Sequence, residues 1–131
     1  MTAAQDFGAA FTAGDVDALA RLLREDVALE LPPREAWYSG RDAVTELLRA
    51  HLAPGIFRLV PVAANGQPAF AVYKRAAGWT FRAHSIIVLT MRGPAIARIS
   101  VFQHPRLFEK FGLPTECLPP AARAAREFPQ T

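Results

Sequence analysis

The sequence predicts an α+β domain in which three helices come first and a mainly antiparallel sheet follows. Apart from a short alternating run at residues 27–31, apolar residues recur at helical spacing up to Pro54-Gly55, and beyond that point they recur with a period of two. With 131 residues, 51% of them hydrophobic and 21% charged, the chain suffices for one domain with its own core and is not a disordered protein. Helices that precede such a sheet must cover one of its faces. We therefore expect the three helices to pack on a curved sheet and to enclose a cavity with it.

The first two helices are short and adjacent. The first is expected to end at Gly14, because apolar residues at helical spacing precede that glycine: Ala3, Phe7, Ala10 and Phe11. Asp15 is a good N-cap for the second helix, whose apolar face has the spacing i, i+3, i+4 and i+7: Val16, Leu19, Ala20 and Leu23. We expect Glu25-Asp26 to close the second helix.

A short strand and a third helix follow. Alternation from Val27 to Leu31 predicts the strand, and Pro32-Pro33 ends it in a loop over residues 34–39. Ser39-x-x-Asp42 resembles a capping box for a helix that stops near Pro54-Gly55. Its apolar face consists of Val44, Leu47, Leu48, His51 and Leu52.

The second half of the chain reads as a meander of four strands: Phe57–Ala64, Gln67–Lys74, Thr80–Arg92 and Ile96–Gln103. Asn65-Gly66 suits the tight turn of the first hairpin, and Ala77-Gly78 makes the second turn. The domain is expected to span residues 1–118, with residues 119–131 as a loose tail rich in Pro, Ala and Arg.

Composition and motifs exclude several classes of function. The formal net charge is +3, but the basic residues are scattered from Arg21 to Arg126 and form no nucleic-acid stripe. No run is apolar enough for a membrane span and no signal peptide is visible, so we expect a cytoplasmic protein that contacts no membrane. A lone Cys117 supports neither a disulfide nor a thiolate zinc site. Nucleotide, zincin and serine-nucleophile motifs are missing, so no metal and no cofactor are expected.

Four strings resemble the SnoaL-like branch of the nuclear transport factor two-like superfamily. They are Ala13-Gly14-Asp15-Val16-Asp17-Ala18-Leu19, Trp37-Tyr38-x-Gly40-Arg41-Asp42-Ala43, Ala64-Asn65-Gly66-Gln67-Pro68-Ala69 and Phe111-Gly112-Leu113-Pro114. The last three together are most similar to the C-terminal SnoaL-like domain of some actinobacterial extracytoplasmic-function sigma factors. The resemblance covers about residues 3–118 and implies a cone-shaped fold. The chain lacks the helical regions by which a sigma factor binds DNA and polymerase, so as a complete product it would be a free-standing relative.

The resemblance implies the fold more strongly than a function, because the superfamily includes isomerases, cyclases, epoxide hydrolases, dehydratases and non-catalytic binding domains. Its enzymes commonly place an Asp or Glu on a late strand as a base. This chain has no acidic residue between Gln67 and His104, and His104-Pro105 stands where related domains often have Asp-Pro. Either a histidine takes the acid/base role or the pocket only binds.

His84 is the preferred central site residue. Under strict alternation it shares a face with Arg82, Ile86 and Val88, and an imidazole exchanges protons near neutral pH. The alternative is a packing histidine. His104, at a strand end, is a candidate for a rim residue or a second proton carrier, whereas His51 is expected to pack on its helix.

Glu30 is the only carboxylate on a predicted strand, and its neighbours Leu29 and Leu31 point to the other face. If Glu30 enters the cavity, burial would raise its pKa and suit it to acid/base work; otherwise it is an ordinary exposed glutamate.

Aromatic and amide side chains supply further candidates. Tyr38 is expected at the cavity mouth as a hydrogen-bond donor, and Trp37 either joins it there or packs against the third helix. Tyr73 and Gln103 are polar tips on apolar strands and would need hydrogen-bond partners if buried. The expected catalytic set is thus His84, Glu30 and Tyr38, and the expected ligand-binding set is Trp37, Tyr73, Gln103 and His104.

Two functions remain open. One, preferred by a small margin, is a cofactor-independent isomerase, cyclase or epoxide hydrolase that acts on a hydrophobic polyketide- or steroid-like substrate, and the missing sigma-factor regions favour it. The other is a non-catalytic ligand-binding or regulatory module, which the missing late-strand carboxylate favours. Under either function a homodimer is expected, because apolar strands invite sheet-to-sheet packing.

Overall fold

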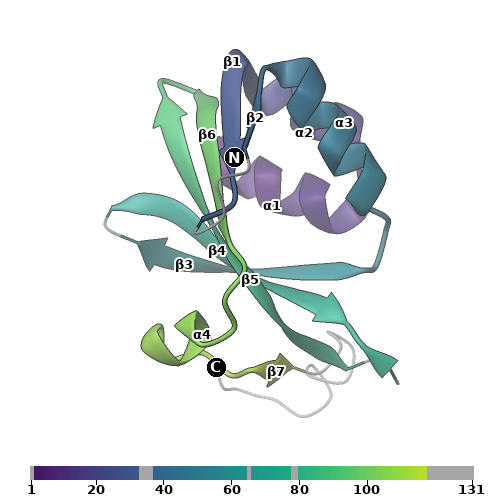
Figure 1. The fold of residues 1–131 in the computed structure, drawn as a ribbon, viewed down its shortest axis with the longest axis vertical. Helices are drawn as coiled ribbons and strands as arrows, with labels where there is room; N and C mark the ends of the chain where they lie inside the picture. Colours follow the sequence, from purple (N-terminus) through teal and green to yellow (C-terminus); the bar gives the residue numbers. More distant parts are fainter. Residues whose placement is uncertain (1, 33–36, 65, 78–79, 118–131) are drawn as a thin grey trace.

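Three N-terminal helices cover one face of a curved sheet, as the sequence predicts. The computed structural model describes residues 2–32, 37–64, 66–77 and 80–117. Helices α1 (Ala3–Ala13), α2 (Val16–Leu22) and α3 (Arg41–His51) gather on one side of the sheet, and the one-turn helix α4 (Leu107–Lys110) lies on the other side (Figure 1).

The described residues form a sheet of seven strands with a single parallel pairing. The strands are β1 (Leu23–Glu30), β2 (Trp37–Ser39), β3 (Phe57–Ala64), β4 (Gln67–Arg75), β5 (Phe81–Arg92), β6 (Ala95–Phe102) and β7 (Glu116–Cys117). They are ordered β2-β1-β6-β5-β4-β3, and β7 pairs with β5. β1 and β6 run parallel, and all other neighbours are antiparallel. The expected α+β class and mainly antiparallel sheet are therefore confirmed.

The first two helix starts follow the local chemistry of the chain. Thr2 and Gln5 form a reciprocal capping box for α1, and Gly14 ends that helix in the left-handed conformation at φ +71°. The Asp15 side chain accepts a hydrogen bond from the Ala18 amide at 3.1 Å and so caps α2.

Three local predictions are wrong, for the same reason. The second helix ends at Leu22 and not at Glu25-Asp26, because Leu23 pairs with Ile96 and starts β1. The expected loop contains strand β2, and Ser39 does not cap α3, because it lies opposite Ala28 on β1. Gly40 precedes α3 instead and makes no side-chain cap. In each case sheet pairing overrides a local signal.

Some predicted turns and the predicted tail lie outside the described residues. Asn65, Gly78 and residues 119–131 belong to this group. The hairpin around Asn65 nevertheless has the expected register, since Ala64 lies opposite Gln67.

The apolar core has two parts, one on each side of the sheet. The larger part fills the space between the helices and the sheet and contains fully buried Phe7, Leu19 and Val44. The smaller part lies under α4 and contains Tyr73, Ile86 and Phe108. In the described residues, no helix is long and apolar enough to cross a membrane.

The α1–α2 turn touches the segment that leaves α3. A Cβ atom at Gly14 would lie 2.8 Å from the Pro54 backbone nitrogen and 2.9 Å from the Ala53 carbonyl carbon. We expect Gly14→Ala to lower the free energy of unfolding by about 2–4 kcal/mol, which combines left-handed strain with overpacking. Chemical denaturation measures the change.

Gly93→Ala is the matched control. Gly93 also has a positive φ, +59°, but a Cβ atom at this position would meet no other atom within 4 Å. Its substitution should cost only the left-handed strain, about 1–2 kcal/mol. Equal losses for the two variants would contradict the proposed contact between the α1–α2 turn and the end of α3.

Candidate functional site

A cavity of about 400 Å³ lies between the helices and the concave face of the sheet. Most of its wall is apolar. This part comes from α1, α3, strands β1, β3, β4, β5 and β6, and the residues directly after β1 and α3: Phe7, Phe11, Leu29, Leu31, Leu47, Leu48, Leu52, Phe57, Val72, Ile87, Ile99 and Val101. Among the described residues, six polar ones also line the cavity: Tyr38, His51, Lys74, His84, Ser85 and Gln103. Size and lining are typical of a small-molecule pocket.

His84 reaches the cavity through an irregularity in β5. Tyr73 pairs with Ala83 and Val72 pairs with Ser85, so His84 is an extra residue in a β-bulge. Because of the bulge, neighbouring His84 and Ser85 both line the cavity. The predicted common face with Ile86 and Val88 is wrong, since those two residues belong to the apolar cluster on the opposite side of the sheet.

The imidazole of His84 is held by neighbours on two strands. Its Nδ1 lies 3.1 Å from Ser85 Oγ, and its ring meets the edge of Phe57 at a centroid distance of 5.6 Å. Burial lowers the pKa of His84, and the positive charge of Lys74 lowers it further. The ring is therefore neutral at neutral pH and can accept a proton or a hydrogen bond.

Tyr38 and Gln103 also line the cavity, as expected for site residues. Tyr38 lies opposite Leu29 in the β1–β2 pair and shares its inward face. Gln103 directly follows β6. The roles of Tyr38, His84 and Gln103 in binding or catalysis stay predictions.

Glu30 and Trp37 face away from the cavity. Since Leu29 points inward, strand alternation turns Glu30 outward, and Trp37 lies opposite Glu30 in the register. Glu30 accepts hydrogen bonds from Ser100 Oγ at 2.9 Å and from Arg98 at 3.4 Å. Trp37 is 64% exposed. Neither residue is among the described residues that line the cavity.

Tyr73 and His104 also lie elsewhere. Tyr73 is buried on the outer side, where its hydroxyl donates to the Pro114 carbonyl at 2.8 Å and its ring meets Phe108 at 5.2 Å. It therefore fastens the segment after α4 to the sheet. His104 is exposed in the turn between β6 and α4, where its carbonyl accepts a hydrogen bond from the Leu107 amide.

Three polar lining residues were not predicted as site residues: Lys74, Ser85 and His51. Lys74 follows an apolar run, which is the sequence pattern of a solvated strand end. Ser85 and His84 both line the cavity only because of the bulge, which the sequence does not reveal. His51 was expected only to pack, and its Nδ1 does lie 2.9 Å from the Leu47 carbonyl of its own helix. The helical spacing of His51 from Leu47 and Leu48 is the sequence feature that indicates a common face with these two lining residues.

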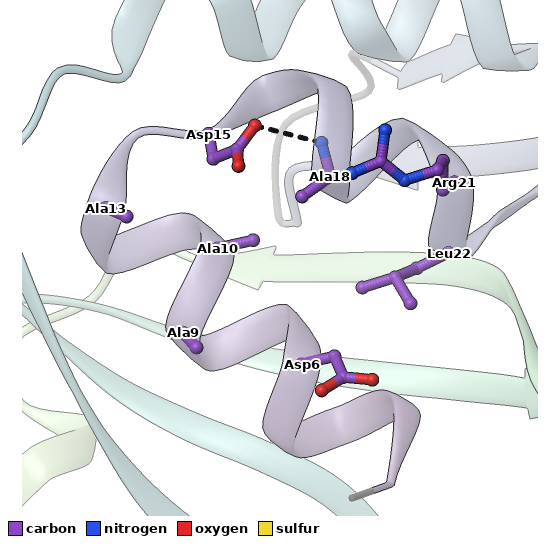
Figure 2. Close-up of a pocket in the computed structure, with 8 residues that line it drawn as sticks. All are labelled: Asp6, Ala9, Ala10, Ala13, Asp15, Ala18, Arg21 and Leu22. Atoms are coloured by element: carbon purple, nitrogen blue, oxygen red, sulfur yellow. Dashed lines mark hydrogen bonds between the residues drawn. The ribbon is translucent and has the colours of Figure 1, made fainter.

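Two other hollows are poorer candidates. Four of the eight described residues that line the groove between α1 and α2 are alanines, and Figure 2 shows that the Asp15 carboxylate accepts a hydrogen bond from the Ala18 amide. A second hollow, on β1, β5 and β6, contains Arg24, Arg92 and Arg98, but Arg24 is paired with Asp26 at 2.8 Å. Within the described ranges no three His, Cys, Asp or Glu side chains group to hold a metal.

Sequence comparison matches the chain with two known groups. The model of the SnoaL-like domain family matches residues 4–101. The ECF RNA polymerase sigma factor SigG of Mycobacterium tuberculosis is 38% identical over 109 residues, which cover 81% of this chain. Those residues span only 29% of the sigma factor.

Solved structures share the fold at low sequence identity. A candidate ketosteroid isomerase from Kribbella flavida matches with a TM-score of 0.63 and 19% identity, covering 98% of this chain and 88% of that one. An LEH-like epoxide hydrolase from Mycobacterium tuberculosis matches with a TM-score of 0.57 and 15% identity, covering 83% of this chain and 86% of that one. At such identities the likeness concerns the fold alone.

The environment of His84 predicts its titration. Its pKa should lie below the ordinary 6.5 in an NMR titration of the imidazole resonances. Lys74→Met should raise that pKa only part of the way, because burial is the larger cause and remains. The unfolded chain binds this proton at higher pH than the folded chain, so the free energy of unfolding should fall as the pH drops below about 6.5.

Two controls accompany this titration. Lys110→Met removes the same charge from exposed Lys110 on α4 and should leave the pKa of His84 unchanged. His84→Gln should reduce the decrease in stability on acidification. A His84 pKa at or above 6.5 in the unmodified protein would contradict the described environment.

Proposed function

The chain belongs to the SnoaL-like domain family, and on this premise we propose that it binds a small, mainly apolar organic molecule in the cavity at His84. The observation that carries the proposal is the composition of the wall: apolar side chains enclose about 400 Å³, and six polar residues interrupt them. Such a wall buries an apolar body and orients it through a few hydrogen bonds.

Binding without catalysis is the preferred version of this function. Among the described residues, none that lines the cavity is an Asp or Glu, and Glu30 is engaged with Ser100 and Arg98 on the other side of the sheet. A carboxylate base is thus missing from the described wall. The similarity to part of a sigma factor also supports a ligand-binding or regulatory module.

A cofactor-independent enzyme is the second candidate, and His84 favours it. A neutral imidazole in an apolar wall can remove a proton beside a carbonyl group, and the Tyr38 hydroxyl can donate a hydrogen bond to the resulting oxyanion. The substrate would be a hydrophobic, polyketide- or steroid-like carbonyl compound. The fold shared with a candidate ketosteroid isomerase agrees with this chemistry.

Filling the cavity tests the binding proposal. The neutral fluorophore N-phenyl-1-naphthylamine should bind the unmodified protein saturably. Leu47→Trp, on the α3 wall, should weaken this binding about tenfold or more, because the larger indole occupies part of the cavity. The probe then loses apolar contact comparable to the burial of one side chain, about 1.5–3 kcal/mol. Fluorescence titration of the probe gives the affinities.

Leu22→Trp is the matched control for this experiment. Leu22 is also partly buried but lines the α1–α2 groove outside the cavity (Figure 2). Its substitution should leave probe affinity unchanged. Absence of saturable binding to the unmodified protein, or a loss with Leu22→Trp alone, would contradict binding in the cavity.

Proton transfer is tested with a Δ5-3-ketosteroid, whose isomerisation produces a conjugated enone that absorbs in the ultraviolet. Under the second candidate, His84→Gln should lower the rate about a hundredfold or more, since a general base commonly contributes 10²–10⁴-fold. Measured affinity for the naphthylamine probe shows whether the variant keeps its cavity. Equal rates with and without His84 would exclude His84 as the base.

A further inference from the structure

One end of the cavity carries an unbalanced positive charge. Lys74 ends the inward face of β4 and lines the cavity together with His84. The other ionisable residues of the described wall are His51 on α3 and Tyr38 on β2, and no described lining residue is acidic. Any charge that the wall offers to a ligand is therefore positive.

Lys74 is an exposed residue at the mouth of the cavity, and its ammonium group lies over an aromatic ring. Its Nζ lies 5.9 Å from the centroid of the Phe57 ring, which is a cation–π contact. Phe57 is opposite Lys74 in the β3–β4 register and meets His84 edge-on at 5.6 Å. Ammonium group, ring and imidazole thus form one cluster, which we call the Lys74 end of the cavity.

Within the described part of the chain, Lys74 has no carboxylate within salt-bridge distance. Its cross-strand neighbour on β5, Arg82, differs in this respect, because Arg82 Nε lies 3.2 Å from a Glu116 carboxylate oxygen. Lys74 and Arg82 are therefore neighbouring cations, and Glu116 offsets the charge of Arg82. The positive charge without a carboxylate partner is that of Lys74, which lines the cavity.

This charge matters because one side of it is apolar. An ammonium group beside a wall of low polarity interacts more strongly with an opposite charge than it does in bulk water. Lys74 is exposed, so only its cavity side is covered by a ligand. On that side a neutral apolar ligand would displace water without replacing its hydrogen bonds, whereas an acidic group on the ligand would replace them.

We infer that the cavity selects an amphipathic organic anion, with an apolar body between α1, α3 and the sheet and one acidic group at the Lys74 end. Lys74 is then the residue that determines specificity. The inference rests on the proposed binding function and names the class of ligand. His84 lies beside the acidic group and donates to it when protonated.

A matched pair of probes tests the inference. 1-Anilinonaphthalene-8-sulfonate and N-phenyl-1-naphthylamine have the same ring system, and only the first carries an acidic group. The unmodified protein should bind the sulfonate more tightly. Lys74→Met should weaken the sulfonate about tenfold and leave the neutral probe within about twofold, because a hydrogen bond to a charged group is lost for one probe alone.

Lys110→Met is the control for overall charge, since Lys110 is exposed on α4 across the sheet. It should leave both affinities unchanged. The pKa of His84, followed by NMR, gives a second readout. The bound sulfonate should raise that pKa because an adjacent anion favours the imidazolium, and the neutral probe should not.

The outcomes distinguish a failure of anion selection from a failure of the proposed binding function. If neither probe binds saturably, the proposed function fails. If both bind equally well, or if Lys74→Met weakens both alike, the cavity binds apolar molecules but the selection of anions is overturned. Equal effects of Lys74→Met and Lys110→Met on the sulfonate would also overturn it, because only net charge would then matter.

Discussion

A row of aromatic rings joins the first helix to the sheet, and both the core and the cavity depend on it. Phe70 meets Phe7 at 5.8 Å, Phe7 meets Phe11 at 5.6 Å, and Phe11 meets Phe57 at 5.5 Å. Gly8 allows this approach, because a Cβ atom there would lie 2.9 Å from the Phe70 ring. The row ends where Phe57 contacts His84 and Lys74. The Phe57 ring thus packs in the core and also contacts the two polar residues at the Lys74 end of the cavity.

The predictable part of the fold is the part set by local chemistry. Gly14 and Asp15 mark a real helix end and a real helix start, and the change of period after Pro54 marks the start of the run of strands β3 to β6. Pairing between distant strands escapes such patterns. It converts Leu23 from a helical residue into the first residue of β1, and it produces β2 from an expected loop.

In the candidate site, too, local sequence patterns predict some residues, whereas others depend on how distant strands pair. Tyr38, His84 and Gln103 line the cavity, but strict alternation assigns His84 to the wrong companions because a bulge cannot be read from the residues around it. Glu30 and Trp37 could be placed only by knowing that Leu29 faces inward. Lys74 has a sequence context like that of any charged strand end, and only its contact with Phe57 distinguishes it.

The parallel pairing of β1 with β6 has a consequence for how the domain forms. Leu29 on the first strand lies opposite Ile99 on the sixth, far along the chain, and both line the cavity. Pairing two such distant segments closes a long loop, which costs chain entropy that the contacts must offset. The cavity wall is complete only when β1 and β6 are paired. A molecule bound to that wall would stabilise the paired state and hence the whole domain, so occupancy and folding are linked by mass action.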